Sequence, residues 1–458
     1  MPDPEPVAEP RPEPLPERRP SLFHHPNFRK LWVGDTISQF GTQVSQLAIP
    51  LVAILFLKAT AFEVALLGTV EFLPFLLFTL PAGAWVDRLQ RRPILIVGDM
   101  GRALLLISIP IASALGVLTI AQLYVVGFGM GILTVFFDVS YQSYLPSLVD
   151  RDQLVEGNAK LEASRSAAEV VGPGLGGYLI GILTAPVAVL VDAVSYAASA
   201  LFVFSIRGSE PKLPPSEGPR DGRVERLRGF GSEIREGLGY VLGHPYLRMI
   251  AASTSTSNLF GNIATGIYLV YVVRVLELAP VQIGLILSLG SLGTLAGALV
   301  ANRIAQRIGV GRSIVLAGAL HGPSVVLIAI APVGGAEPFL IASAALGGFS
   351  ALVYNINQVS FRQAITPERM QGRMNATMRF LVWGTIPISS VLSGVLATIL
   401  GMSMTIWIGA ILSFTPVLFL LFSPILSIRT MPTSPDDWTA RNEALEAAAA
   451  ELGQPPGM

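Results

Sequence analysis

Four polar side chains follow one face of the first long apolar stretch: Asp35, Gln39, Thr42 and Gln46. Their spacing of i, i+4, i+7 and i+11 aligns them along a single face of an α-helix. Such a stripe needs water or a ligand beside it, because polar groups are costly to bury among apolar ones. A carboxylate withdrawn from water takes up a proton near neutral pH. The stripe therefore predicts a polar cavity wall with a group suited to proton transfer.

Ionisable side chains inside apolar stretches are concentrated in the first half of the chain. They are Asp35, Glu71, Asp99, Arg102, Asp138, Glu162, Arg165, Glu169 and Asp192, whereas the second half has Arg379 and His321. Each such group costs about 2.5 to 3.5 kcal/mol at the centre of a membrane span, which makes it a functional candidate. We expect proton coupling in the first half, at Asp35 and Asp138 first, and then at Glu71 and Glu169.

Five of these residues also have a structural interpretation. Asp99 precedes Arg102 by three residues, while Glu162 and Glu169 lie three and four residues from Arg165. These spacings allow fixed ion pairs on one helix face. For these five side chains we favour fixed pairing over proton transfer.

The elements that position these residues are membrane-spanning helices. The chain of 458 residues is 52% apolar and 14% charged, with a mean hydropathy of +0.60, whereas soluble domains are about 25% charged. About 20 apolar residues cross the roughly 30 Å hydrocarbon layer. We identify twelve stretches of that kind, without the two-residue alternation of a β-barrel. They are 31 to 57, 63 to 86, 94 to 116, 120 to 142, 161 to 183, 186 to 206, 247 to 273, 280 to 301, 313 to 333, 338 to 361, 374 to 399 and 404 to 427.

Basic residues predict which helix ends face the cytoplasm. Of the 31 lysines and arginines, only Lys58 and Arg274 fall in loops that this topology places outside. We therefore expect a multi-pass protein of the bacterial cytoplasmic membrane with both termini in the cytoplasm.

Composition also divides the chain into segments. Residues 1 to 20 alternate proline with charge and lack the apolar core of a signal peptide, while the central loop is rich in arginine, proline and glycine. The expected segments are a disordered N-terminal tail (1–20), a six-helix half (21–206), a cytoplasmic linker (207–246), a second six-helix half (247–428) and a cytoplasmic C-terminal tail (429–458).

The two halves repeat each other in sequence. The matching positions are His25-Pro26 and His244-Pro245, Phe40-Gly41 and Phe260-Gly261, and Asp87-Arg88 with Arg92 and Asn302-Arg303 with Arg307. Three matches in the same order indicate an internal duplication. The predicted fold is an all-α membrane protein of two parallel six-helix repeats, an arrangement typical of carriers whose substrate site lies between the repeats.

The loop between the second and third spans, GAWVDRLQRR, contains Gly83, Asp87, Arg88, Arg91 and Arg92. It resembles the signature G-x-x-x-D-R-x-G-R-R of the major facilitator superfamily, with glutamine at its second glycine. A carboxylate among arginines can bridge helix ends by charge-assisted hydrogen bonds. The resemblance implies that this loop is a conformational gate. A positive-inside bias alone explains the arginines, but neither Asp87 nor Gly83.

The resemblance covers about residues 21 to 430 and, within the superfamily, points to the bacterial drug/proton antiporters, including macrolide-efflux and siderophore-export proteins. It makes Asn302, Arg303 and Arg307 the corresponding gate residues of the second half. The fifth span carries a second motif that is similar to the antiporter signature: Gly172, Pro173, Gly176 and Gly177. We expect these small residues to pack against Gly290, Gly293 and Gly297 of the eighth span; generic small-residue packing is the alternative.

In this superfamily the first, fourth, seventh and tenth helices line the cavity. The resemblance thus implies that Asp35 and Asp138 face a second wall in the other half. The candidates there are Asn258, Asn262, Tyr354, Asn357 and Gln358. Asp192 and His321 fall on helices that are peripheral in this superfamily, where hydrogen bonding between helices is the simpler role.

The resemblance and the acidic residues together predict a secondary active transporter that exports amphipathic small molecules or drugs by proton-coupled antiport. A dedicated exporter of one endogenous metabolite, such as a siderophore, and a non-transporting membrane receptor on a carrier fold remain as alternatives. The sequence has no cysteine and no histidine cluster, so we expect no metal, no cofactor and no enzymatic activity. The expected partners are the small-molecule substrate, protons and the lipid bilayer, without nucleic acid, and the protein is expected to be a monomer.

Overall fold

The computed structural model describes residues 21–86, 89–150, 153–207 and 235–432. The predicted tail 1–20, residues 208–234 of the predicted linker, and the C-terminal tail from residue 433 lie outside this part of the chain. Asp87 and Arg88 of the gate motif also lie outside it. The described residues form helices and no β-strand, as the sequence predicts.

The first half consists of six long helices. They are α1 (Pro26–Leu51), extended by a π-helical turn (Val52–Phe56), α2 (Ala61–Val86), α3 (Arg91–Ala114), α4 (Ile120–Leu148), α5 (Leu154–Leu183) and α6 (Ala185–Phe204). Local sequence sets their starts: Thr119 caps α4 by accepting from the Gln122 N–H at 3.3 Å. Before α2, Thr60 and Glu63 bond reciprocally, since the Glu63 N–H donates to Thr60 Oγ1 and the Thr60 N–H to Glu63 Oε2.

The second half contains more helical segments because three of its long helices are interrupted. They are α8 (Pro245–Thr265), α9 (Tyr268–Arg274), α10 (Pro280–Ile308), α11 (Val310–Ala329), α12 (Glu337–Ala364), α13 (Glu368–Trp383), α14 (Thr385–Leu400), α15 (Met402–Leu412) and α16 (Thr415–Leu421). The repeat appears in the caps: the His25 and His244 rings each accept from the backbone N–H three residues later, at 3.1 and 3.5 Å, and each precedes a proline.

Eleven helices in the described part of the chain are long and apolar enough to cross a membrane. The remaining predicted span, 247 to 273, corresponds to α8 and α9. It is also helical, but the polar run from Ser253 to Asn258 makes it less apolar than the others. The protein is therefore a helical multi-pass membrane protein, and its predicted fold class is confirmed.

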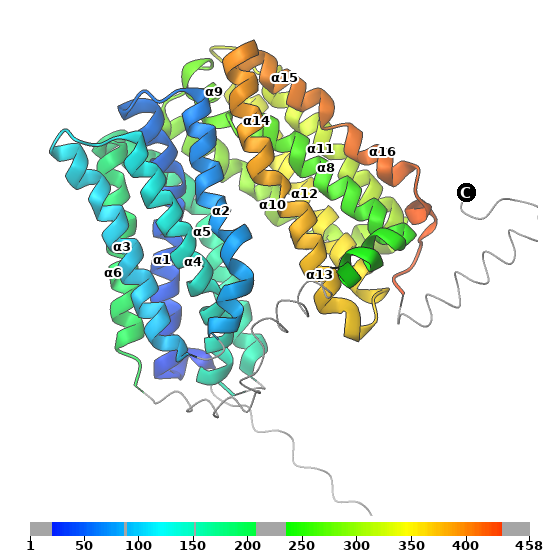
Figure 1. Cartoon of the computed structure of the whole chain (residues 1–458), viewed down its shortest axis with the longest axis horizontal. Coiled ribbons are helices and arrows are strands. Elements are labelled where there is room, and N and C mark those ends of the chain that lie inside the picture. Colours follow the sequence, from blue (N-terminus) through cyan, green and yellow to red (C-terminus); the bar gives the residue numbers. More distant parts are fainter. Residues whose placement is uncertain (1–20, 87–88, 151–152, 208–234, 433–458) are drawn as a thin grey trace, which may run out of the picture.

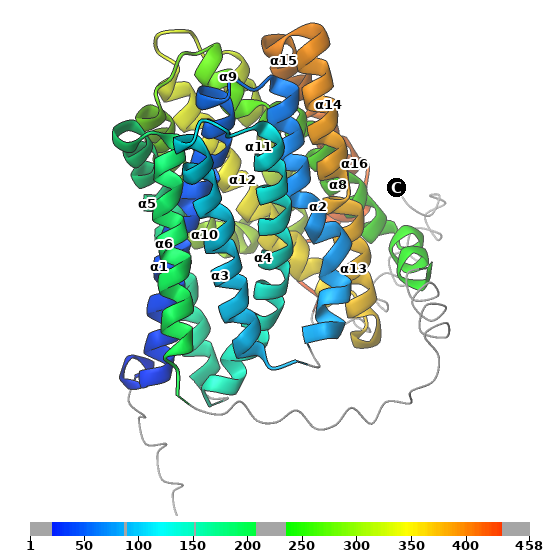
Figure 2. The same cartoon turned by 60° about the vertical axis from the view of Figure 1, so that its left-hand side comes forward.

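Figure 1 shows the two helical halves side by side, α1 to α6 on the left and α8 to α16 on the right. We call the end where α1 starts the basic end, because it carries Arg29, Lys30, Arg91, Arg92, Arg207, Arg303, Arg307, Arg312, Arg362 and Arg369. The other end, with the loops around Lys58 and Glu277, is the opposite end. In Figure 2, α2 of the first half runs beside α14 of the second.

The halves are joined at the opposite end. One hydrophobic cluster there includes Ile54 and Ala59 of the first half with Val270 and Leu276 of the second. Arg274 adds a polar contact, since its Nη2 donates to Ala59 O at 2.6 Å. At the basic end the clusters are separate, one around Phe28 in the first half and one around Phe361 in the second. The two halves therefore pack together at one end and independently at the other.

Candidate functional site

The first half encloses a polar cavity of about 460 Å³. Its walls come from α1, α2, α3, α4, α5 and α6, and include every cavity and proton-coupling candidate that the sequence analysis placed in this half. These are Asp35, Gln39, Thr42, Gln46, Glu71, Asp138 and Glu169. The stripe predicted on α1 thus lines the cavity along its length, together with Ser38, Ser45, Arg102, Arg165, Asp192 and Tyr196.

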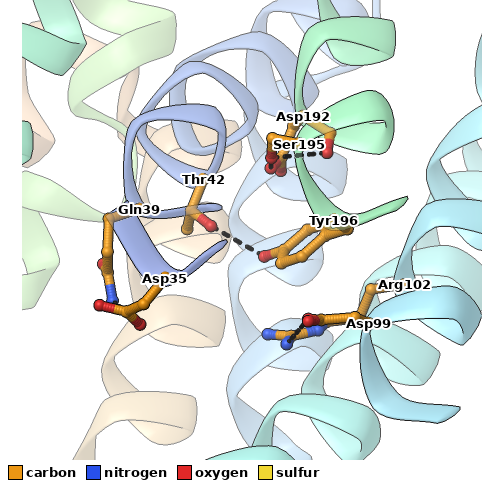
Figure 3. A network of polar contacts seen from close by, with 8 residues as sticks. All are labelled: Asp35, Gln39, Thr42, Asp99, Arg102, Asp192, Ser195 and Tyr196. Carbon is orange, nitrogen blue, oxygen red and sulfur yellow. Dashed lines mark hydrogen bonds and ion pairs between the residues drawn. The ribbon is translucent and has the colours of Figure 1, made fainter. Parts of the chain in front are cut away.

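Arg102 is the centre of a buried network (Figure 3). Its guanidinium forms an ion pair with Asp99 one turn earlier on α3, and both side chains are almost fully buried. The rings of Phe137 and Tyr196 lie 4.1 and 4.2 Å from the guanidinium carbon. A buried charge is tolerated when it is paired and stacked in this way. The fixed pair considered for Asp99 and Arg102 is therefore formed, although Arg102 also lines the cavity.

Two further contacts involve α6, one with α1 and one within α6 itself (Figure 3). The Tyr196 hydroxyl lies 2.8 Å from Thr42 Oγ1 on α1, and Ser195 Oγ donates to Asp192 Oδ1 at 2.9 Å. Gly41 permits this close crossing, because a Cβ there would lie 2.6 Å from Asp192 Oδ1. Asp192 is fully buried, and its hydrogen bond from Ser195 lies within α6, so the hydrogen bond between helices that the sequence suggested stays a prediction. It also reaches the cavity wall, which its position on α6 did not indicate.

Asp35 lies on α1 on the cavity side of this network (Figure 3). Only 7% of it is exposed, and Gln39 Nε2 is 3.5 Å from its Oδ1, the outer limit of a hydrogen bond. Tyr141 of α4 is its neighbour. Among the described residues Asp35 forms no ion pair, so nothing in this part of the chain neutralises its charge by direct contact.

Glu71 reaches the same cavity from α2. It passes over Gly127 of α4, where a Cβ would lie 2.8 Å from Glu71 Cγ, and Gly131 accommodates the α2 backbone one turn further on. The two glycines are spaced i, i+4 and make the space in which this carboxylate lies. That spacing is visible in the sequence but could be assigned to Glu71 only once α2 and α4 were seen to pack together.

The remaining acidic candidates differ in their partners. Glu169 is paired with Arg165 at 3.1 Å, and Arg165 also lies 4.0 Å from Glu162. Asp138 is exposed within the cavity wall and forms no ion pair among the described residues, although the charges of Arg102 and Arg165 are close enough to act on it. Of the four proton-coupling candidates, Glu169 alone therefore contacts a basic partner within the part of the chain that the structure describes.

The structure does not bring the second-half candidates to this cavity. Asn258 Nδ2 donates to Val382 O at 3.1 Å, a carbonyl near the break between α13 and α14, and so satisfies a backbone group freed by that break. The Tyr354 hydroxyl lies 2.8 Å from Thr254 Oγ1, and Asn262 donates to Asn258 O at 2.7 Å. These side chains are hydrogen-bonded within their own half.

The other two second-half candidates bond along their own helix. Asn357 donates to Val353 O at 2.8 Å, and Gln358 Nε2 donates to Asn355 Oδ1 at 3.1 Å. His321 lies against Gly261 of α8, where a Cβ would be 2.7 Å from its Nε2. The sequence could not indicate these local bonds, because they depend on rotamers and on helix breaks.

The described part of the gate motif connects helix ends at the basic end. Arg92 Nε donates to Val203 O at 3.3 Å and its Nη2 donates to Phe204 O at 2.5 Å, so a cation stabilises the last turn of α6. Gly83 lies in α2, and Arg91 begins α3. In the second half Asn302, Arg303 and Arg307 are exposed at the end of α10.

The glycine motif of α5 lies at the contact between the halves. A Cβ on Gly177 would lie 3.0 Å from Gly284 Cα of α10, and the Gly174 N–H donates to Ser288 Oγ at 2.8 Å. Gly172 and Gly176 face α1 instead, next to Gln43 and Val44, and Pro173 lies inside the helix.

The predicted partners of this motif on the eighth span are corrected by the structure. Gly290, Gly293 and Gly297 pack against α12, next to Ala344, Ala345 and Phe349. The α5 contact lies one to two turns closer to the start of α10, at Gly284 and Ser288. Small residues occur on two faces of α10, and sequence alone does not say which face meets which helix.

The sequence profile of the transmembrane secretion effector family matches residues 20–451. The chain belongs to the transmembrane secretion effector family. This family lies within the major facilitator superfamily, and its members are membrane transporters. The resemblance read from the loop and helix motifs is confirmed at this level.

Curated relatives of this transmembrane secretion effector are exporters. It is 28% identical to the multidrug efflux pump Tap of Mycolicibacterium fortuitum over 363 residues, 75% of this chain and 81% of Tap. It is 25% identical to the enterobactin exporter EntS of Salmonella choleraesuis over 360 residues, 77% of this chain and 81% of EntS.

Solved structures share the fold of this transmembrane secretion effector at low identity. A bacterial homologue of the iron transporter ferroportin, in an inward-facing state, matches with a TM-score of 0.65 and 16% identity, over 87% of this chain and 98% of that one. The nucleoside transporter NupG matches with a TM-score of 0.67 and 11% identity, over 86% and 97%.

Proposed function

We propose that this transporter exports amphipathic small molecules by proton-coupled antiport with alternating access. Its family and its relatives, named as a multidrug efflux pump and an enterobactin exporter, support the direction of transport. The acidic residues of the cavity support coupling to protons. They are Asp35, Glu71, Asp138, Glu169 and Asp192.

We place the basic end in the cytoplasm of a bacterial cell, because lysines and arginines accumulate on the cytoplasmic side of membrane proteins. Both termini then face the cytoplasm. The halves are joined at the opposite end and pack separately at the basic end. This arrangement corresponds to the state in which an exporter takes up its substrate from the cell.

The observation that carries the proton coupling is the contrast between paired and unpaired acids. Asp99 and Glu169 each contact an arginine, whereas Asp35, Glu71 and Asp138 lack an ion pair among the described residues. A carboxylate with little water and no cation in contact, as Asp35 and Glu71 are, is neutralised by a proton or by a cationic ligand. Competition between proton and substrate for these acids is the simplest basis for antiport.

The conformational change needs a contact that opens and a loop that closes. We assign the first role to the α5–α10 contact at Gly177 and Gly284. We assign the second to the gate motif, whose Arg92 already bridges α3 and α6 at the basic end and whose Asp87 would engage neighbouring helix ends when that end closes.

A dedicated exporter of one endogenous metabolite is the second candidate. The similarity to EntS has nearly the same extent as the similarity to Tap, so a siderophore-like product fits the comparisons as well as a range of drugs. The two candidates share a fold and a coupling scheme and differ in substrate range.

The test is efflux from proteoliposomes under an imposed pH gradient, with a panel of cationic, neutral and anionic amphipathic dyes. Asp35→Asn and Asp138→Asn should abolish gradient-driven efflux, whereas Glu277→Gln, which removes an exposed carboxylate at the opposite end, should not. Export of several dyes supports the multidrug function. Export of one chemical type alone supports a dedicated exporter, and gradient-driven efflux that persists in both variants contradicts coupling at these acids.

A further inference from the structure

The second half is nearly free of acidic residues. Between Pro245 and Pro432 the sequence contains three: Glu277, Glu337 and Glu368. Glu277 and Glu337 lie at the opposite end, where Glu337 accepts from Gln282 at 2.8 Å. Glu368 is exposed in the first turn of α13. No carboxylate of this half is therefore available deep inside it.

Two arginines of this half nevertheless lack an acidic partner among the described residues: Arg379, exposed on α13, and Arg362, half-buried at the end of α12. Arg379 lies eleven residues into α13, with its guanidinium carbon 5.5 Å from the centre of the Trp383 ring. Arg362 belongs to the last turn of α12, but its charge acts on Tyr354, two turns back along the helix, and on Arg379. Its Nε is buried and has no hydrogen-bond partner among the described residues. The side chain thus runs inward, in the direction that helical side chains favour.

These arginines differ from those of the first half. Arg102 contacts Asp99, and Arg165 contacts Glu169, so each has an acidic partner. Arg362 and Arg379 have none among the described residues, and they repel each other. Positive-inside bias explains an arginine at the end of α12, but it does not explain Arg379, three turns into α13, without a carboxylate beside it among the described residues.

Arg379 lines a groove of about 340 Å³ between α2 and α13. Three aromatic side chains also line it, Phe75 from α2 and Phe380 and Trp383 from α13, together with smaller residues such as Thr79 and Asn375. Phe72 extends this surface, with its ring centre 5.6 Å from Phe75 and 5.9 Å from Trp383. Phe75 also lines the acidic cavity of the first half, so the groove and the cavity lie on either side of this one side chain.

We propose that Arg379, with Arg362, binds a carboxylate of the exported molecule, while the aromatic walls of the groove hold its rings. The proposal rests on the export function proposed above and narrows its substrate to aromatic amphipathic carboxylates. A guanidinium matches a carboxylate with two parallel hydrogen bonds, and aromatic faces suit planar rings. A molecule that extends past Phe75 would present its other end, when basic, to the acids of the cavity.

The experiment uses a rhodamine that carries a free carboxylate and the methyl ester of the same dye. Binding to the purified full-length protein is measured by fluorescence anisotropy, without a membrane or a proton gradient. Arg379→Gln should weaken binding of the acid roughly 10- to 100-fold and binding of the ester by less than about threefold. Arg379→Lys should weaken binding of the acid to an intermediate extent, because lysine keeps the positive charge but cannot form the two parallel hydrogen bonds of a guanidinium. Arg312→Gln, which removes an exposed arginine of α11, is the matched control and should change neither.

A second measurement needs no variant. Phenylglyoxal modifies arginines, and mass spectrometry reports the extent at each site. The acid dye should protect Arg362 and Arg379 but leave Arg303 reactive, and the ester should protect none of them.

Four results would overturn the proposal. If Arg379→Gln weakens binding of both dyes equally, or if the native protein binds the ester alone, Arg379 is not a carboxylate site. Efflux of the ester from proteoliposomes then shows that the proposed export function still holds. If Arg379→Glu abolishes transport and the added change Asp138→Arg restores it, Arg379 forms a contact between the halves and not a substrate site. If the native protein neither binds nor exports either dye, both the export of such dyes and this proposal are wrong.

Discussion

The contact between Gly177 of α5 and Gly284 of α10 gives a quantitative prediction for the conformational equilibrium. A Cβ on Gly177 would lie 3.0 Å from Gly284 Cα, and it would come closer still to the carbonyl oxygen of Pro280. Both neighbours are backbone atoms, so the helices must separate to accept Gly177→Ala. Overpacking of this kind costs about 1–3 kcal/mol.

That cost applies only to the state in which the two helices are in contact. The gain in helix propensity from glycine to alanine, about 1 kcal/mol, applies to both states and cancels. Gly177→Ala should therefore shift the equilibrium away from the state closed at the opposite end by about 5- to 150-fold. Gly68 of α2 is the matched control, because a Cβ there meets nothing within 4 Å.

The assay is electron–electron double resonance between spin labels at Leu115→Cys and Val333→Cys. These positions lie in loops at the opposite end, one in each half, and are 71% and 64% exposed. The chain contains no cysteine, so the labels attach without background. Gly177→Ala should add a population with a longer distance, and Gly68→Ala should not. Identical distance distributions for both variants and the native protein would refute the argument from the α5–α10 contact.

Three further predictions follow from single groups. Asp87→Asn should impair transport while leaving dye binding within about twofold of native, because the gate acts on the conformational equilibrium; lost binding in an anisotropy titration would contradict the gate role. Arg102→Gln should destabilise the protein by about 3–5 kcal/mol, since it leaves Asp99 buried without its partner, and an unchanged melting temperature in detergent would show that the pair contributes nothing. Burial lowers the pKa of His244, the cap of α8, to about 4 from 6.5. The unfolded chain therefore binds more protons between these two pH values, and the stability of the protein should decrease as the pH falls from 6.5 to 4. His244→Asn keeps a capping acceptor and should flatten this part of the plot of stability against pH, whereas an unaltered slope would show that His244 does not cause it.

The features that sequence predicted well are local along one helix. Apolar length gave the spans, and the 3.6-residue period placed Asp35, Gln39, Thr42 and Gln46 on one wall of the cavity. The i, i+3 and i, i+4 spacings gave the ion pairs of Arg102 and Arg165. Each of these depends on positions within a single helix.

The features that sequence missed depend on how helices meet. The space for Glu71 comes from two glycines on α4, and the partner of Gly177 is Gly284 because of the register between α5 and α10. The breaks at Gly266 and Gly384 divide two predicted spans, and polar side chains such as Asn258 satisfy carbonyls there instead of lining the cavity. A single sequence does not specify how neighbouring helices are aligned along each other, so these contacts could not be derived from it.

The central claim is that substrate and protons compete for the acids of the first-half cavity. It is tested most directly by loading proteoliposomes with a pH-sensitive dye and adding an exported substrate with no pH gradient imposed. Substrate entering the liposomes down its gradient should then drive protons out of them in the native protein, and Asp35→Asn or Asp138→Asn should abolish the pH change. Substrate flux at the native rate without any pH change in the native protein would contradict proton-coupled antiport.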